Sequence, residues 1–308
     1  MTVDSFIGAD VVTAEGKIIH CNDNENADLM WALRGGGGNF GIVTKFVFKL
    51  QDVGPMVYAG PIVYPLDSGK DVFSKFTELA KDDVMSEELT PWVVLRQCPP
   101  FPFIPEEHHF KPVIVIAICY CGNVDGGEAA VKPFLELGTP IGSHVGPCPL
   151  SAWNQAFDGM LTPGVRNYWK TCNIPEHFGE GIIDVFLDAA TKLPNFGSEV
   201  FICRVGGYTN KIAKDETAYA HRGAAYFVNC HTRWEKVEED DINRKFAADL
   251  MNGLGPFTDG TQYQNFVSEG DEETSDVHGS NKAKLIEVKK KYDPTNFFRV
   301  NYNISTSS

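Results

Sequence analysis

Hydrophobic and polar positions in the first fifty residues predict a small unit of three strands and one helix. The β-branched run Ala9–Ala14 is followed by Glu15-Gly16, a pair typical of hairpin turns, and then by the return strand Lys17–His20. Asn24–Leu33 begins with polar residues and reads as a short helix. Alternating apolar side chains then predict a closing strand over Ile42–Leu50.

From about residue 53 the pattern changes to longer strands that alternate with helices. Because many of these strands are neither uniformly apolar nor spaced as βαβ units, we expect a broad antiparallel sheet with helices on one side, which is an α+β fold. The predicted strands are Val57–Tyr64, Pro91–Gln97, Pro112–Cys121, Ile141–Val145, Glu199–Gly206 and Ala224–Arg233. The predicted helices are Ser68–Leu79, Gly126–Leu137, Ser151–Met160, Gly181–Lys192 and Glu239–Leu254.

Three further segments have an unusual composition. The loop Cys98–Pro105 is dense in proline and aromatic residues, which fits either a rigid surface cover or a lid on the substrate side. Near the C-terminus a lysine-rich helix is predicted over Asn281–Tyr292, and Asp293-Pro294 stops it. The asparagine-rich end of the chain, Asn296–Ile304, is expected to dock in an extended form on another surface through its amide side chains.

Length and charge limit the possible partners. A chain of 308 residues favours two lobes, and its formal net charge is −14. Because an acidic protein repels phosphate groups, we expect neither nucleic acid nor an anionic membrane as a partner. No apolar run approaches the roughly 18 residues of a spanning helix, and Met1–Asp4 does not begin a signal peptide. The localisation is therefore unknown, and cytoplasmic if Met1 is the true start.

The cysteine and histidine residues do not predict a metal site. Eight cysteines are too few and too irregularly spaced for a disulfide scaffold. Cys119 and Cys121 share one face of a predicted strand, which fits a metal or redox pair, but small buried residues are favoured because no second pair lies at ligand spacing. The adjacent histidines of Glu106–His109 lack a third ligand, so a solvated loop is favoured.

Glycines are concentrated in Gly35–Gly41. Exposed backbone N–H groups of such a cluster can bind phosphate. However, a dinucleotide-binding fingerprint needs a strand before the loop and a helix after it, whereas here a helix precedes and a strand follows. The remaining interpretation is a turn whose backbone closely approaches a ligand or a neighbouring strand.

Blocks along the whole chain, in this order, resemble the berberine bridge enzyme-like FAD-linked oxidases, which have the vanillyl-alcohol-oxidase (PCMH-type) fold. The first blocks resemble the end of that family's FAD-binding domain, and later ones its substrate domain and its C-terminal module. The blocks are Ala9–Gly16, Asp28–Gly37, Asn39–Thr44, Leu161–Lys170, Ala220–Arg222 with Trp234-Glu235 (a late strand pair), Tyr263–Asn265 and Lys290–Asn301.

The resemblance implies a set of site residues. Backbone groups of Gly41, Ile42 and Val43 are expected at the adenine end of FAD, and Asn301 and Asn303 at the pyrimidine edge of the flavin. Tyr263 is expected near the reactive face of the flavin, where a tyrosinate can accept the substrate proton during hydride transfer.

The assignment of Tyr263 rests on the family. Without it, the ordinary interpretation is a half-buried strand tyrosine. A cation such as Lys170 is one way to lower a phenol pKa. The family often has a second tyrosine where this chain has Phe266, so a second hydroxyl is absent here.

The resemblance also implies a division of the chain. Residues 1–52 correspond to the C-terminal part of the FAD-binding domain, 53–260 to the substrate domain and 261–308 to the C-terminal segment that returns to the FAD lobe. The family's flavin-attachment loops align before Met1. We therefore expect an FAD-dependent oxidase of a small alcohol, sugar or amine, with a second chain as a possible source of the remaining FAD lobe. The alternative is a flavin-free remnant that binds a ligand or a partner.

Overall fold

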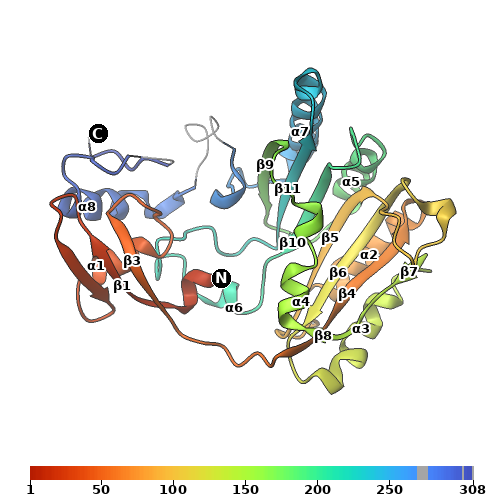
Figure 1. Ribbon diagram of the computed structural model, residues 1–308, viewed down its shortest axis with the longest axis horizontal. Coiled ribbons are helices and arrows are strands. Elements are labelled where there is room, and N and C mark those ends of the chain that lie inside the picture. Colours follow the sequence, from red (N-terminus) through yellow and green to blue (C-terminus); the bar gives the residue numbers. More distant parts are fainter. Residues whose placement is uncertain (269–276, 300–301, 307–308) are drawn as a thin grey trace. The chain divides into compact units, whose positions relative to one another are not determined.

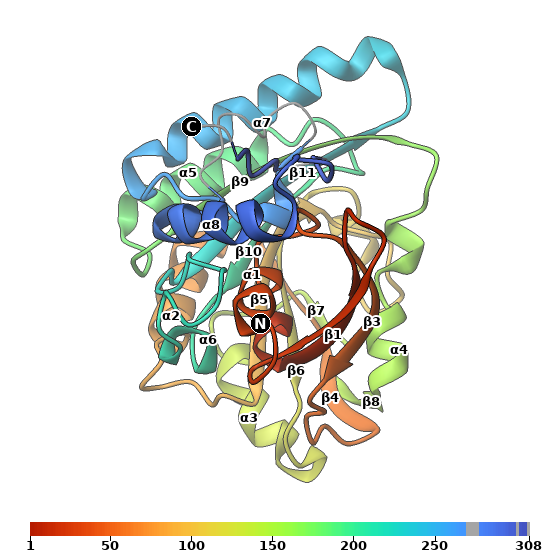
Figure 2. The same ribbon diagram turned by 90° about the vertical axis from the view of Figure 1, so that its left-hand side faces the viewer.

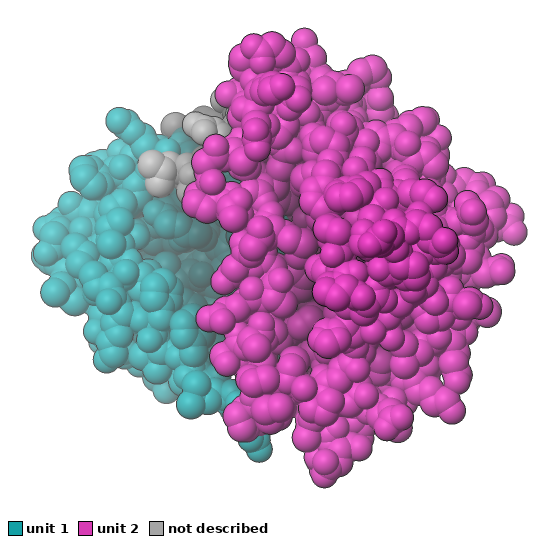
Figure 3. Space-filling view, turned by 45° about the vertical axis from the view of Figure 1, so that its right-hand side comes forward, with its two compact units in different colours: residues 1–52, 208–223, 261–308 teal, residues 53–207, 224–260 magenta. Residues whose placement is uncertain are grey.

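The computed structural model describes residues 1–268, 277–299 and 302–306. The chain forms two compact units, coloured separately in Figure 3. Unit 1 contains Met1–Asp52, Tyr208–Gly223 and Thr261–Ser308, and unit 2 contains Val53–Gly207 and Ala224–Gly260. Tyr208–Gly223 is therefore part of unit 1, although the sequence places it within the substrate domain.

Unit 1 is built on a three-stranded antiparallel sheet. Its strands are β1 (Phe6–Val12), β2 (Ile18–Asn22) and β3 (Ile42–Phe48), in the order β2-β1-β3. Gly16 supplies the positive φ of 77° that the turn between β1 and β2 needs. Helix α1 (Ala27–Leu33) and helix α8 (Lys282–Tyr292) pack together on this sheet (Figures 1 and 2). The predicted hairpin, helix, closing strand and C-terminal helix are confirmed.

Tyr208–Gly223 is anchored to unit 1 by hydrogen bonds to α1 and its C-terminal end. Trp31 Nε1 donates to Asp215 O at 2.8 Å, and Tyr219 N donates to Arg34 O at 3.0 Å. After the short helix α6 (Tyr208–Lys211) the segment is irregular. The expectation of a strand at Ala220–Arg222 was therefore wrong, because this backbone follows α1 instead of pairing with a strand.

Unit 2 contains one eight-stranded sheet in which all pairs are antiparallel. The order is β7-β4-β6-β5-β10-β11-β9, with β8 also paired to β4 (Figure 1). The strands are β4 (Met56–Pro65), β5 (Leu89–Gln97), β6 (Pro112–Tyr120), β7 (Gly142–Ser143), β8 (Gly146–Pro149), β9 (Arg166–Ile174), β10 (Glu199–Arg204) and β11 (Tyr226–Trp234).

Helices cover one face of this sheet and bury the main core. They are α2 (Gly69–Leu79), α3 (Gly127–Leu135), α5 (Glu180–Thr191) and α7 (Asp240–Leu254). Phe73, Phe134 and Phe186 from these helices pack against alternate strand residues such as Leu95 and Ile116. We call this side the helix face. The α+β fold with a large antiparallel sheet covered by helices is confirmed. In the part of the chain that the structure describes, no helix is both long and apolar enough to span a membrane.

The opposite face, which we call the pocket face, carries Trp92, Val94 and Arg96 of β5 and Glu199 and Phe201 of β10. Helix α4 (Leu150–Gln155) and the 3-10 turn Asp158–Met160 lie over it. The predicted helix Ser151–Met160 is thus shorter than expected. The chain leaves the helix after Gln155, and the apolar side chains of the second half line a cavity.

Strand β9 is not evident from the hydrophobic pattern. Its first half, Arg166–Lys170, is mostly polar and follows the turn-forming sequence Thr162-Pro163-Gly164. Pairing with β11 across nine registered positions, from Arg166↔Trp234 to Ile174↔Tyr226, nevertheless makes it the edge strand of the sheet. Tertiary pairing therefore decides its structure.

Candidate functional site

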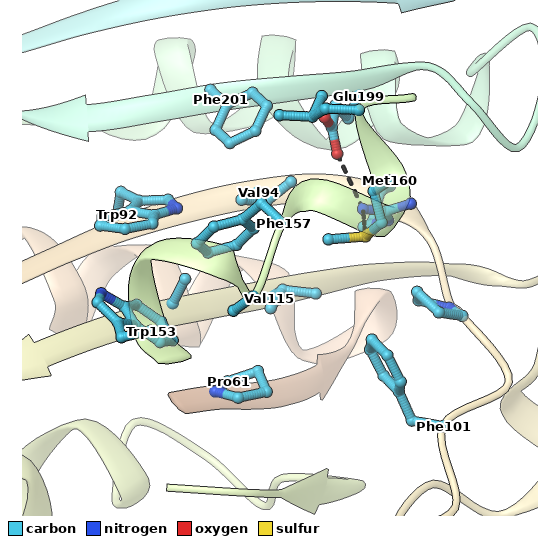
Figure 4. Close-up of a pocket in the computed structure, with 15 residues that line it drawn as sticks. Pro61, Trp92, Val94, Phe101, Val115, Trp153, Phe157, Met160, Glu199 and Phe201 are labelled. Carbon is cyan, nitrogen blue, oxygen red and sulfur yellow. Dashed lines mark hydrogen bonds and ion pairs between the residues drawn. The ribbon is translucent and has the colours of Figure 1, made fainter. Parts of the chain in front are cut away.

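The pocket face of unit 2 contains a cavity of about 280 Å³ (Figure 4). Strands β4, β5, β6 and β10 form its floor, while α4, the following turn and the loop after β5 form its walls. Because the proline-dense loop Cys98–Pro105 contributes Pro99 and Phe101, this loop is part of the cavity wall. The lining residues are Pro61, Trp92, Val94, Arg96, Pro99, Phe101, Val115, Ala117, Trp153, Ala156, Phe157, Met160, Leu161, Glu199 and Phe201.

Three aromatic rings gather at one side of the cavity. Trp92 of β5 lies 5.9 Å from the ring of Trp153 and 5.7 Å from that of Phe157, and the latter two are 5.4 Å apart. Trp153 belongs to α4 and Phe157 to the turn that follows it, and both rings lie against Trp92. Trp92 Nε1 is buried and has no hydrogen-bond partner among the described residues. An unpaired buried donor beside a cavity is available to a ligand.

A buried ion pair lies at the other side of the cavity. Arg96 Nη1 is 3.0 Å from Glu199 Oε2, and the two side chains are 8% and 6% exposed. His231 Nδ1 lies 3.5 Å from the second oxygen of Glu199. The sheet register aligns all three, since Glu199 is opposite Arg96 on one side and His231 on the other. The polar side chains of Arg96, Glu199 and His231 are therefore largely paired with one another.

Polar residues continue along the pocket face toward β9. The next row of the sheet contains Val94, Phe201, Asn229 and Thr171 in register. Asn229 is 2% exposed, and its Oδ1 has no partner among the described residues. The sequence analysis missed both this row and Trp92. Their alternation within each strand was visible, but only the pairing between strands brings them together.

Tyr263 lies in unit 1, directly before the 3-10 turn Gln264–Phe266, and not in a strand. Asn265 Nδ2 donates to Tyr263 Oη at 2.9 Å. The ring of Tyr219 meets Tyr263 edge-on at 6.2 Å, and Phe266 does so at 5.1 Å. Burial, followed by the charge of a Tyr263 phenolate, raises the pKa of Tyr219 well above its ordinary value. Tyr219 therefore stays a neutral phenol beside Tyr263.

The predicted adenine-end residues Gly41, Ile42 and Val43 lie at the start of β3. Within the described residues β3 pairs only with β1, so it is an edge strand whose other side has free backbone groups. Gly41 is constrained by the protein itself, because a Cβ there would lie 2.7 Å from Val12 O. Asn303 is described and exposed, whereas Asn301 lies outside the described residues.

The other loop glycines are also explained by close packing. A Cβ on Gly36 would lie 2.6 Å from Ala32 O and 2.7 Å from Leu285. Gly35 has a φ of 136°, and a Cβ there would overlap the backbone of Tyr219. Of the two interpretations of this loop, approach to neighbouring backbone accounts for both residues.

The C-terminal segment is held against this loop by two buried side chains. Lys289 Nζ donates to Asn39 O at 2.7 Å, to Asp293 Oδ2 at 2.6 Å and to Phe298 O at 2.6 Å. Asn39 in turn donates through Nδ2 to Tyr302 O and accepts from Ile304 N, both at 3.0 Å. Asn303 is thereby fixed between two anchored residues.

Two other sequence-based suggestions can be located. Lys170 lies on the helix face, 5.7 Å from the ring of Tyr168, and so on the opposite side of the sheet from the cavity. Burial, followed by the neighbouring thiols of Cys121 and Cys148, raises the pKa of Cys119 to about 11. Among the described residues, no group of three or more His, Cys, Asp or Glu side chains could hold a metal ion.

Comparison with known proteins agrees with the order of the motifs. Residues 263–305 match the family model described as berberine and berberine like. The chain is 29% identical over 305 residues to an FAD-linked oxidoreductase of Dictyostelium discoideum and 26% identical over 315 residues to an (R)-6-hydroxynicotine oxidase of Paenarthrobacter nicotinovorans. These alignments cover 99% and 98% of this chain, but only 64% and 65% of the relatives.

The fold is similar to that of a solved relative as well. The structure of Physcomitrella patens BBE-like 1 superposes with a TM-score of 0.83 at 20% identity, covering 99% of this chain and 66% of that one. The chain thus spans slightly less than two thirds of the length of each of these proteins. Residues 263–305 thus match the berberine and berberine-like family model, and the whole chain is similar in sequence to FAD-linked oxidoreductases and in fold to a BBE-like protein.

Proposed function

We propose that this chain provides the substrate-binding part of an FAD-dependent oxidoreductase that acts on a small alcohol, sugar or amine. The cavity on the pocket face is the candidate substrate site. One observation carries the proposal: within the segment that matches the family model, Asn265 donates a hydrogen bond to the oxygen of Tyr263. Such a donor stabilises a phenolate, the form in which tyrosine acts as a base.

The residues present fit FAD in part. Because backbone groups of successive strand residues point alternately toward and away from β1, one of Ile42 and Val43 offers its N–H and C=O groups at the free edge of β3. Asn303 offers an exposed amide. The described glycine loop is filled by protein contacts and offers no phosphate cradle at Gly35 or Gly36. We therefore propose that FAD binds when another polypeptide segment, such as one from a second chain, completes the lobe.

Bound FAD would supply the two-electron acceptor for a hydride from the substrate C–H bond. The role of Tyr263 is to take the O–H or N–H proton, so that the substrate leaves as a carbonyl compound or an imine. Tyr219, which stays neutral, packs the edge of its ring against that phenol. O₂ or another acceptor would reoxidise the flavin.

The visible spectrum of the purified chain tests this function. We expect a flavin band after FAD is added, at least when the rest of the lobe is supplied by a relative's N-terminal fragment. A chain that stays colourless under both conditions contradicts the proposal. That result favours the second candidate, a flavin-free binding protein, which one observation supports: the cavity is formed entirely by residues of unit 2.

Substitution Tyr263→Phe in the flavin-bearing form tests the base. Loss of general-base catalysis is expected to lower the turnover rate by about a hundredfold or more and to flatten its dependence on pH. Tyr208→Phe is the matched control, since Tyr208 is 61% exposed in the same unit. Unchanged turnover across pH in Tyr263→Phe removes the assignment.

A further inference from the structure

We propose that the cavity on the pocket face binds a planar aromatic group that carries a hydrogen-bond acceptor, and that Trp92 Nε1 donates to this acceptor. This inference rests on the proposed function only in treating the cavity as the substrate site. It narrows the substrate from any small alcohol, sugar or amine to an aromatic one.

The walls of the cavity favour an aromatic ligand. Ten of the fifteen lining residues carry no nitrogen, oxygen or sulfur in their side chains. Among them, Pro61, Phe101, Phe157 and Phe201 lie around the cavity in Figure 4. Trp92, Trp153 and Phe157 already pack ring against ring at 5.4 to 5.9 Å. A flat ring gains both apolar burial and ring contacts with such walls.

The polar groups of the cavity restrict what else the ligand carries. Arg96 and Glu199 are paired with each other at 3.0 Å, and Met160 Sδ lies 3.0 Å from Arg96 Nη1. A ligand charge would have to compete with this pair. Trp92 Nε1, by contrast, is buried and unpartnered within the described residues. An indole N–H only donates, so its complement is an acceptor such as a ring nitrogen or a carbonyl oxygen.

The small number of polar groups in the cavity disfavours a sugar as the ligand. A disaccharide would bring several hydroxyl groups into this cavity, and each needs a partner to replace water. Aromatic side chains can stack on a sugar ring, but the paired Arg96 and Glu199 and one indole N–H do not satisfy that many hydroxyls. Most of them would lose hydrogen bonds on entering.

Three probes separate these cases in ligand-observed NMR titrations of the full chain: quinoline, naphthalene and xylobiose. Quinoline and naphthalene have the same ring size, and only quinoline has an acceptor nitrogen. We expect quinoline to bind about two- to tenfold more tightly than naphthalene, the range of one net hydrogen bond. Xylobiose is expected to bind more weakly than both.

The substitution Trp92→Phe keeps an aromatic ring and removes the donor. It should lower the affinity for quinoline to that for naphthalene while leaving naphthalene binding nearly unchanged. Ala156→Trp, at an exposed wall position, should abolish binding of both and does not depend on how the sheet tolerates a change at Trp92. Ile242→Ala on α7, 58% exposed and away from the cavity, should change neither affinity.

Three results would overturn the inference: xylobiose binding as tightly as quinoline, a quinoline-to-naphthalene ratio that survives Trp92→Phe, or quinoline binding that survives Ala156→Trp. None of these titrations requires FAD. Absence of flavin binding would therefore contradict the proposed function and leave the ligand class intact, whereas failure of the probes would contradict only the ligand class.

Discussion

Lys289 and Asp293 are both completely buried, which is rare for charged side chains. The ammonium group has three acceptors, one each from the glycine loop, from α8's own end and from the tail. Asp293 also accepts from the backbone N–H groups of Phe297 and Phe298. These bonds join three stretches of unit 1 that the sequence separates by up to 250 residues.

Substitution Lys289→Met is therefore expected to destabilise the chain by about 3–5 kcal/mol, because it leaves a buried carboxylate without its cation. The free energy of unfolding, from urea titration, measures this. Lys290→Met is the neighbouring control. Its partner Glu287 is 73% exposed, so the change should stay within about 0.5 kcal/mol. Equal effects of the two substitutions would contradict a specific role for the buried pair.

The same pair predicts a dependence of stability on pH. Burial raises the pKa of Asp293, but the hydrogen bond from Lys289 and those from the Phe298 and Phe297 backbone outweigh it and hold the pKa below 3.8. A depressed carboxyl pKa contributes stability that is present above the unfolded-state pKa and is lost as pH falls through the folded value. Unfolding free energy should thus decrease below about pH 4. In Asp293→Asn the part of this decrease that comes from protonation of Asp293 should be absent. If the unfolding free energy of that variant fell with pH as steeply as that of the parent chain, the assignment of this part to Asp293 would be contradicted.

At the scale of elements, the glycine loop between α1 and β3 offers a paired test. Gly35→Ala places a methyl group against the backbone of Tyr219 at a φ of 136°, whereas a Cβ on Gly38 meets nothing within 4 Å. We expect Gly35→Ala to cost about 1–3 kcal/mol or more, and Gly38→Ala to change the thermal midpoint little. If Gly38→Ala were the more harmful of the two, close packing at Gly35 would not account for the stability of this loop.

Elements with a clear local pattern were predictable from the sequence. The hairpin around Gly16 and the amphipathic helices α2, α5 and α7 begin and end within a few residues of their expected positions. The polar strand β9 was not predicted, since its structure depends on β11, some sixty residues away. The cavity was not predicted for the same reason. Trp92 comes from β5, Trp153 from α4 and Phe157 from the turn after α4, and only the tertiary fold and the early end of α4 bring them together.

At the scale of the whole molecule, unit 1 has an apolar surface next to an open sheet edge. Ile18 and Ile42 flank Val12 in one cross-strand row, and they are 73% and 56% exposed. An edge strand beside such a row favours pairing with another polypeptide. This is the surface that we propose the remainder of an FAD lobe would cover.

Self-association of the isolated chain follows from this surface, and the net charge of −14 opposes it. Raising the ionic strength screens that repulsion while leaving apolar contacts in place. The mean mass from light scattering should therefore rise with protein concentration and with added NaCl. The double substitution Ile18→Thr and Ile42→Thr keeps β-branched residues in both strands and should suppress the increase. Val237→Thr, which changes a 59% exposed valine of unit 2, should leave the increase in mass unchanged.

A chain that is monomeric at every salt concentration, or a double variant that associates as the parent does, would mean that this face does not direct association. The partner that completes the lobe would then have to bind elsewhere on unit 1.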